Sequence, residues 1–234
     1  MTLLGRWLGS APDSETARAA RHAWRDAARP AQDTALDRVR WVVVDTETSG
    51  LDPHRDRLLS IGACAIEQGR VALASTFEAF LHQREPSDVE NVLVHGIGHR
   101  AQGAGEQPDS ALAGYLRFAR ADVVVGYHTL FDVVMLDRAA RAHLGIRYDP
   151  LSIDLGLILP PLTQQPGAEG WDLDRWLGHY RLGMSGRHDA LADAFATAQL
   201  FLLALQHARR RGIGTLRELL RVQVRQLALL QSRA

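Results

Sequence analysis

The chain has 234 residues, of which 46% are apolar and 23% are charged, values that are ordinary for a soluble globular protein. This length fits one domain with appendages or at most two small domains, and the core can be large enough to need no disulfide staples. Arg6 interrupts the apolar residues at the start of the chain, so neither a signal peptide nor a transmembrane span is expected there.

The net charge is zero, but the charges are unevenly distributed. Residues 41–207 hold 13 arginines against 21 acids, whereas residues 208–234 hold 7 arginines and one acid, and the chain has no lysine. An acidic centre with a basic tail fits an enzyme whose carboxylates are neutralised by metals while arginines meet an anion. A solvated, charged helix explains the tail equally well.

The first predicted element is an Ala-rich helix over residues 13–29, capped by Asp13 or Ser14 and stopped by Pro30. Strands are then predicted at 40–46, 58–66, 71–81, 121–126 and 151–154, with Gln68 and Gly69 as a hairpin turn. Further helices are predicted from 109–110 onward and at 131–144, 172–180, 189–210 and from 215 onward, with irregular stretches at 86–105 and 160–170. Three strands in a meander, followed by alternating helix and strand, predict an α/β sandwich with a mixed sheet.

Cys64 is the single cysteine, so no disulfide can form within the chain. It lies in an apolar stretch and is interpreted as a buried small hydrophobe. A reducing, cytoplasmic location without membrane attachment is the expectation that follows.

Four acidic residues and a histidine are the candidates for chemistry. Asp45 and Glu47 are two apart on a predicted strand, so their side chains point the same way. Asp132 follows the fourth strand, and Asp193 lies in the first turns of a helix just after His188. Strand ends and the helices that follow them converge on one edge of an α/β sheet, and all-oxygen ligation favours Mg²⁺ or Mn²⁺ over Zn²⁺.

Each candidate also has an ordinary structural explanation. Asp132 and Asp189 can be helix N-caps, and His188 can be a loop histidine. Asp154 is interpreted as a structural cap in preference to a catalytic group. These explanations are plausible one at a time and jointly improbable.

The order Asp-x-Glu, Asp, His-x4-Asp resembles that of the DnaQ-like, DEDDh-type 3′–5′ exonucleases, a family that includes the proofreading epsilon subunit of bacterial DNA polymerase III. The resemblance covers about residues 40–207. The segments that carry it are Val44-Asp-Thr-Glu-Thr-Ser-Gly-Leu51, Leu59-Ser-Ile-Gly-Ala63, His95-Gly-Ile97, Val125-Gly-Tyr-His-Thr-Leu-Phe-Asp132 and Arg187-His-Asp-Ala-Leu-Ala-Asp-Ala194.

The resemblance implies a ribonuclease H-like mixed sheet flanked by helices. It places the exonuclease domain at 39–207, between an N-terminal helical extension at 1–38 and an Arg-rich C-terminal helix at 208–234. It implies that two Mg²⁺ ions, replaceable by Mn²⁺, are held by Asp45, Glu47, Asp132 and Asp193, with His188 as general base. The residues implied to contact the terminal nucleotide are Thr48, Leu51, His95, Ile97 and Phe131.

One departure from the family pattern concerns substrate preference. The family often carries His-Asn-Ala where this chain has Tyr127, His128 and Thr129, so His128 replaces an Asn that helps grip the substrate backbone. The expected substrate is the 3′ end of single-stranded nucleic acid, with DNA favoured over RNA, although no residue that reads the 2′-OH can be identified.

The sequence leaves open an alternative function and the identity of protein partners. The alternative function is a non-catalytic module that keeps the exonuclease fold within a replication or repair complex. Residues 226–230 (Gln-Leu-Ala-Leu-Leu) faintly resemble the pentapeptide that docks on the sliding clamp, although the apolar stripe of a terminal helix explains them too. A polymerase partnership like that of the epsilon subunit is not supported by the tail, which is expected to pack through its leucines.

Overall fold

The computed structural model describes residues 13–83, 103–183 and 189–233. Within these ranges the strands form one sheet in the order β3-β2-β1-β4-β5. The strands are β1 (Trp41–Thr48), β2 (Leu58–Glu67), β3 (Arg70–Phe80), β4 (Val123–Gly126) and β5 (Ser152–Asp154). β1, β2 and β3 pair antiparallel, whereas β4 and β5 run parallel to β1, so the predicted mixed sheet is confirmed.

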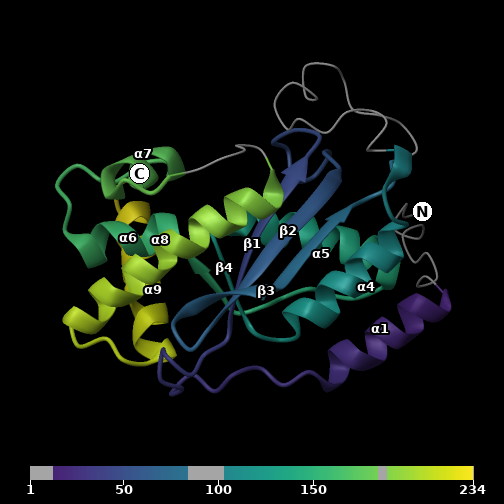
Figure 1. Cartoon of the computed structure of the whole chain (residues 1–234), viewed down its shortest axis with the longest axis horizontal. Coiled ribbons are helices and arrows are strands. Elements are labelled where there is room, and N and C mark those ends of the chain that lie inside the picture. Colours follow the sequence, from purple (N-terminus) through teal and green to yellow (C-terminus); the bar gives the residue numbers. More distant parts are fainter. Residues whose placement is uncertain (1–12, 84–102, 184–188, 234) are drawn as a thin grey trace, which may run out of the picture.

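Helices cover both faces of this sheet (Figure 1). They are α1 (Glu15–Asp26), α4 (Pro108–Ala119), α5 (Leu130–Leu144), α6 (Leu155–Thr163), α7 (Leu173–Tyr180), α8 (Ala190–Arg210) and α9 (Leu216–Gln231). One apolar core joins the sheet to α6, α7, α8 and α9, and a second joins it to α4, α5 and α1. None of the helices in the described ranges is long and apolar enough to cross a membrane.

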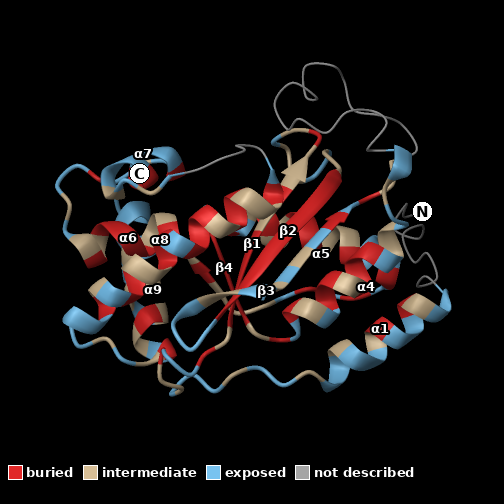
Figure 2. Ribbon diagram, viewed as in Figure 1, coloured by how far each residue is buried: buried red, intermediate tan, exposed pale blue. Residues whose placement is uncertain are grey.

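β1 contributes to both cores because its side chains alternate between the faces. Trp41 and Val43 belong to the core under α8, while Val42 and Val44 belong to the core under α5. The central strands are accordingly buried along most of their length (Figure 2). By the same alternation, the side chains of Asp45 and Glu47 point to the face of the sheet covered by α8. The side chain of Thr46 points to the opposite face, which is covered by α5.

The hairpin between β2 and β3 is where the sequence predicts it. Gln68 has φ 51° and Gly69 has φ 74°, and Glu67 pairs directly with Arg70. Two successive left-handed residues give the two-residue turn whose twist matches antiparallel strands. Cys64, on β2, is fully buried as expected.

Two of the differences from the predicted elements are caused by proline. Residues 160–163 were expected to be loop, but Pro160 and Pro161 lie inside α6, whose apolar side chains are buried in the core. Burial there outweighs the two backbone hydrogen bonds that prolines cannot donate. α4 begins at Pro108, immediately before the expected caps Asp109 and Ser110, because proline suits the first helical turn.

The C-terminal helix is a packing element over its first turns. Thr215 and Glu218 form a capping box at the start of α9, and Leu216 and Leu219 are fully buried. The expectation that the later leucines are also buried is wrong, since Leu227 is 44% and Leu230 is 38% exposed.

Candidate active site

Three carboxylates converge where β1 ends on the α8 face. Asp45 and Glu47 come from β1, and Asp193 comes from the first turn of α8. One carboxylate oxygen from each residue lies within 4.8 Å of the others. Asp193 is only 5% exposed, so this group of negative charges is partly withdrawn from water.

The start of α8 is fixed both by a cap and by close contact with the sheet. Asp189 caps the helix by accepting a hydrogen bond from Ala192 N at 2.9 Å, as the sequence analysis allowed. The helix then passes directly over Gly62 of β2, the residue paired with Asp45. A Cβ atom at Gly62 would lie 2.1 Å from the backbone of Ala190, so only glycine permits this approach.

This cluster suits a divalent metal ion. Carboxylates that approach so closely repel one another unless a cation lies between them. Their oxygens are the ligands preferred by hard cations, and ligand oxygens on opposite sides of an ion with bonds of about 2.0–2.6 Å lie no more than about 5 Å apart. The residues present therefore fit Mg²⁺ or Mn²⁺.

Asp132 lies at the same strand end but outside this group of three. It is on the first turn of α5, 5% exposed, and its Oδ1 accepts a hydrogen bond from Thr46 Oγ1 at 2.6 Å. Burial raises the pKa of Asp132 to about 7, against the opposing effect of the Thr46 hydrogen bond. Because Thr129 occupies the N-cap of α5, Asp132 is not the helix cap, and its role as a metal ligand stays a prediction.

Asp154 has the structural role expected of it. Its Oδ1 accepts from Gly156 N at 2.9 Å, which caps α6, and from His128 N at 3.1 Å. His128 itself has φ 57°, a left-handed conformation in which both Asn and His are enriched among non-glycine residues. The residue that departs from the family pattern is therefore held in a defined position at the end of β4.

The loop between β1 and β2 is tightly folded around Asp56. Its carboxylate accepts hydrogen bonds from Ser49 Oγ at 3.0 Å and from Asp52 N at 2.7 Å. Thr48 Oγ1 donates to Gly50 O at 2.6 Å. This folding leaves Leu51 88% exposed at the tip of the loop.

Another apolar residue near the site was missed by the sequence analysis. Leu130, the first residue of α5, is 73% exposed, while its neighbour Phe131 is partly buried against the core under α5. Exposed apolar groups such as Leu51 and Leu130 suit contact with an unstacked base. The available signal was an apolar residue at a helix start, two positions before a candidate ligand.

Three predicted site residues lie outside the described residues. They are His188, the candidate base, and His95 and Ile97, the candidate substrate contacts. Their roles stay predictions.

With this geometry established, comparison with known proteins decides the family. The family model described as Exonuclease matches residues 42–201, which include all of β1 after its first residue and most of α8. The chain belongs to the exonuclease family. The expected DnaQ-like membership is thereby confirmed, whereas the h-type assignment depends on His188 and stays a prediction.

Relatives and solved structures agree with this family. The chain is 32% identical over 188 residues to a DNA polymerase III subunit epsilon-like protein of Rhodobacter capsulatus, covering 78% of this chain and 26% of the relative. It is 23% identical to the DNA polymerase III subunit epsilon of Rickettsia typhi, covering 71% of this chain and 74% of the relative. The chain thus spans about a quarter of the length of the first of these relatives.

The fold is also that of E. coli exonuclease I, whose structure in complex with a dT13 oligonucleotide superposes with a TM-score of 0.62. The identity is 19%, and the match covers 74% of this chain and 42% of that one. At this identity the likeness establishes the fold alone. It agrees with the predicted ribonuclease H-like sheet flanked by helices.

Proposed function

We propose that this protein is a metal-dependent 3′–5′ exonuclease. It removes nucleoside 5′-monophosphates one at a time from the 3′ ends of single-stranded nucleic acid, with DNA favoured over RNA. The observation that carries the proposal is the approach of Asp45, Glu47 and Asp193 to within 4.8 Å in a chain of the exonuclease family. Such a cluster has little structural use, because it costs free energy in the absence of a cation.

The proposed site assigns a role to each candidate residue. Asp45, Glu47, Asp132 and Asp193 hold two Mg²⁺ ions, and Mn²⁺ can replace them. When bound, these ions neutralise the charge that develops on the phosphate and on the leaving 3′-oxygen. His188 accepts a proton from the attacking water, as the neutral imidazole of a general base can.

Substrate positioning is assigned to side chains around the strand end. The proposed contacts of the terminal nucleotide are Thr48, Leu51, His95, Ile97 and Phe131, to which the exposed position of Leu130 adds a sixth candidate. The preference for single-stranded DNA is supported by the oligonucleotide complex of exonuclease I and by relatives named as DNA polymerase subunits. Those names also support a polymerase as partner, while a sliding-clamp contact through residues 226–230 stays a prediction.

The test uses matched DNA and RNA oligomers that carry a label at the 5′ end. A 3′–5′ exonuclease gives a ladder of shortened labelled products and nucleoside 5′-monophosphates, in the presence of Mg²⁺ and not of EDTA. The Asp45→Asn variant is the inactive control. Tight binding of the oligomers without any shortening would instead identify a non-catalytic interaction module.

The base is tested separately. His188→Ala should lower kcat by about 10²–10⁴-fold, the usual range for loss of a general base. Calorimetry should give an unchanged Mn²⁺ affinity, because His188 is not proposed as a ligand. A lost Mn²⁺ affinity would mean that the histidine binds the metal instead.

A further inference from the structure

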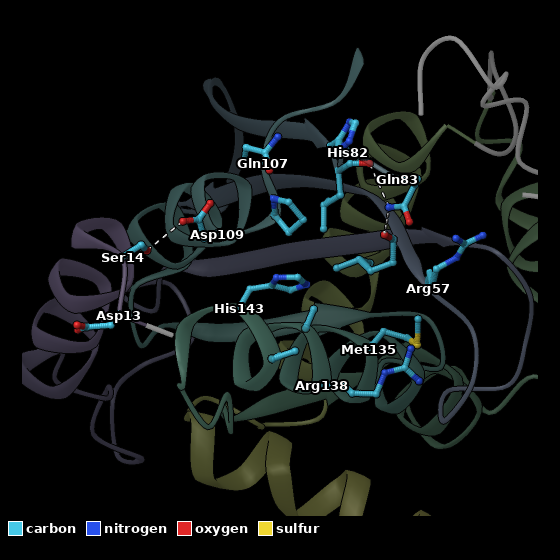
Figure 3. A pocket seen from close by; sticks show the side chains of 15 residues that line it. Asp13, Ser14, Arg57, His82, Gln83, Gln107, Asp109, Met135, Arg138 and His143 are labelled. Carbon is cyan, nitrogen blue, oxygen red and sulfur yellow. Dashed lines mark hydrogen bonds between the residues drawn. The ribbon is translucent and has the colours of Figure 1, made fainter. Parts of the chain in front are cut away.

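A recess lies on the α5 face of the sheet, and none of the three clustered carboxylates lines it. It encloses about 910 Å³ between the start of β2, the end of β3, the start of α4 and the side of α5 (Figure 3). This volume is within the range of about 300–1,000 Å³ typical of ligand sites. We refer to it as the α5 cavity.

One end of the α5 cavity carries two arginines and adjoins the proposed active site. Arg57 directly precedes Leu58, which pairs with Thr48 at the end of β1. Arg138 lies on α5, nearly two turns after Asp132, and donates a hydrogen bond to the carbonyl of Pro53 in the loop between β1 and β2. In Figure 3 both guanidinium groups lie at the same end of the cavity. The cationic end of the cavity is therefore the end next to the site.

The opposite end is acidic. Asp13 and Asp109 line it, and Asp109 is held by a hydrogen bond from Ser14 Oγ at 3.0 Å. Figure 3 places these residues at the far side of the cavity from the arginines. An anion is attracted to the arginine end and repelled by the acidic end, so the cavity favours one orientation of a ligand that has a phosphate at one side.

Apart from the two arginines, the two aspartates and two histidines, the residues that line the cavity are uncharged. Leu58 and Leu81 form an apolar part of its lining, and the Gln83 side chain is fixed by donating to both of their carbonyl oxygens, at 2.9 and 3.1 Å. His143 also faces the cavity, and burial lowers the pKa of its imidazole, so the ring is neutral at pH 7. An apolar surface with neutral hydrogen-bonding groups suits a nucleobase better than a second phosphate.

We propose that the α5 cavity binds a nucleotide of the single-stranded substrate that lies upstream of the scissile bond. Its phosphate contacts Arg57 and Arg138, and its base enters the uncharged middle of the cavity. This inference rests on the proposed exonuclease function and deepens it. A longer strand would make contacts in the cavity that a dinucleotide is too short to make, so the enzyme would prefer the strand. Arginine suits this role because its guanidinium group can bind a phosphate through two hydrogen bonds.

The test compares Arg57→Gln and Arg138→Gln with the matched control Arg141→Gln. Arg141 lies on the same helix, is exposed and pairs with Asp137 outside the cavity. The quantity measured is the ratio of kcat/KM for a dT12 oligomer to that for a dinucleotide. Each cavity variant should lower this ratio about tenfold, the usual effect of losing a charged hydrogen bond, whereas the control should keep the wild-type ratio.

A salt titration of dT12 binding gives a second readout that does not depend on turnover. The slope of log K against log salt concentration should fall by about 0.7 for each lost phosphate contact, measured with EDTA present. Cavity variants with the ratio and the slope of the control would overturn the inference while leaving the exonuclease function intact. A wild-type protein that never shortens dT12 would instead refute the proposed function, and the salt slopes would still decide whether the cavity binds the strand.

Discussion

Gly62 shows how a residue without a side chain can determine the geometry of the proposed active site. The start of α8 rests on this residue, and the same helix turn carries Asp193 toward Asp45 and Glu47. In Gly62→Ala the added methyl group would lie 2.1 Å from backbone atoms, so α8 must shift away from the sheet. A displacement of about 1 Å at a reacting group can lower the rate about 100-fold, and kcat should fall by that order.

The control for this prediction is Gly178→Ala. Gly178 lies in α7, where an added Cβ meets no atom within 4 Å, so its activity and melting temperature should stay at or above the wild-type values. Calorimetry with Mn²⁺ should give weakened binding in Gly62→Ala alone. Normal Mn²⁺ affinity and turnover in that variant would mean that α8 does not position Asp193 as inferred.

Asp132 makes the stability of the metal-free protein depend on pH. Its pKa is about 7 in the folded chain and 3.8 in the absence of burial, so the folded state binds the extra proton between these values. Stability therefore falls as the pH rises from about 4 through 7. In EDTA, Asp132→Asn should melt above the wild type at pH 8 and close to it at pH 4, because the amide avoids a buried charge and its oxygen can still accept from Thr46. Melting curves that differ equally at both pH values would contradict this.

Some of these residue roles could be predicted from the sequence, and others could not. The alternation of side chains along a strand was enough to predict that Asp45 and Glu47 lie together. The preference for Asp at helix N-caps was enough to predict the roles of Asp189 and Asp154. Gly62 could not be singled out, because the need for glycine arises from a helix that begins 128 residues later in the chain. Such a constraint exists only once the elements are packed.

At the scale of elements, α9 tests whether the basic tail is structural. Leu219 is fully buried, whereas Leu229 on the same helix is 51% exposed. Leu219→Ala should lower the free energy of unfolding by about 2–5 kcal/mol, and Leu229→Ala by no more than about 0.5 kcal/mol. Urea denaturation of the two variants measures the difference. Equal, small effects would indicate that α9 detaches readily and that its arginines are its functional part.

The helices and strands also differ in how well their local sequence predicts them. The β2–β3 hairpin was predictable because Gln68 and Gly69 supply the turn and the flanking residues supply the strands. α6 was missed because Pro160 and Pro161 argue locally against a helix, while the burial that retains it comes from α8 and α9. The same limit applies to Leu227 and Leu230, whose exposure depends on where α9 leaves the core.

At the scale of the whole molecule, the proposed metal cluster and the α5 cavity lie on opposite faces of the sheet. The three-carboxylate cluster faces α8, while Asp132 and the α5 cavity lie on the side of α5. Thr46 links the two sides, because its backbone lies between Asp45 and Glu47 on β1 while its side chain donates to Asp132 on the α5 face. A substrate strand that used both parts would pass around the loop between β1 and β2, where Leu51 is exposed.

Because the proposed metal ligands come from different elements of the fold, metal binding should raise the melting temperature of the entire chain. A cation that binds the folded protein at 100 times its dissociation constant stabilises it by about 2.7 kcal/mol, which raises the melting temperature by several degrees in a chain of this size. Mg²⁺ or Mn²⁺ should produce this rise in the wild type.

Asp45→Asn should melt above the wild type in EDTA, because one of three repelling carboxylates is gone, and should lose most of the rise with metal. Asp149→Asn, which alters an exposed carboxylate before β5, should respond to metal as the wild type does. An equal rise in all three proteins would place the bound ions outside the proposed site.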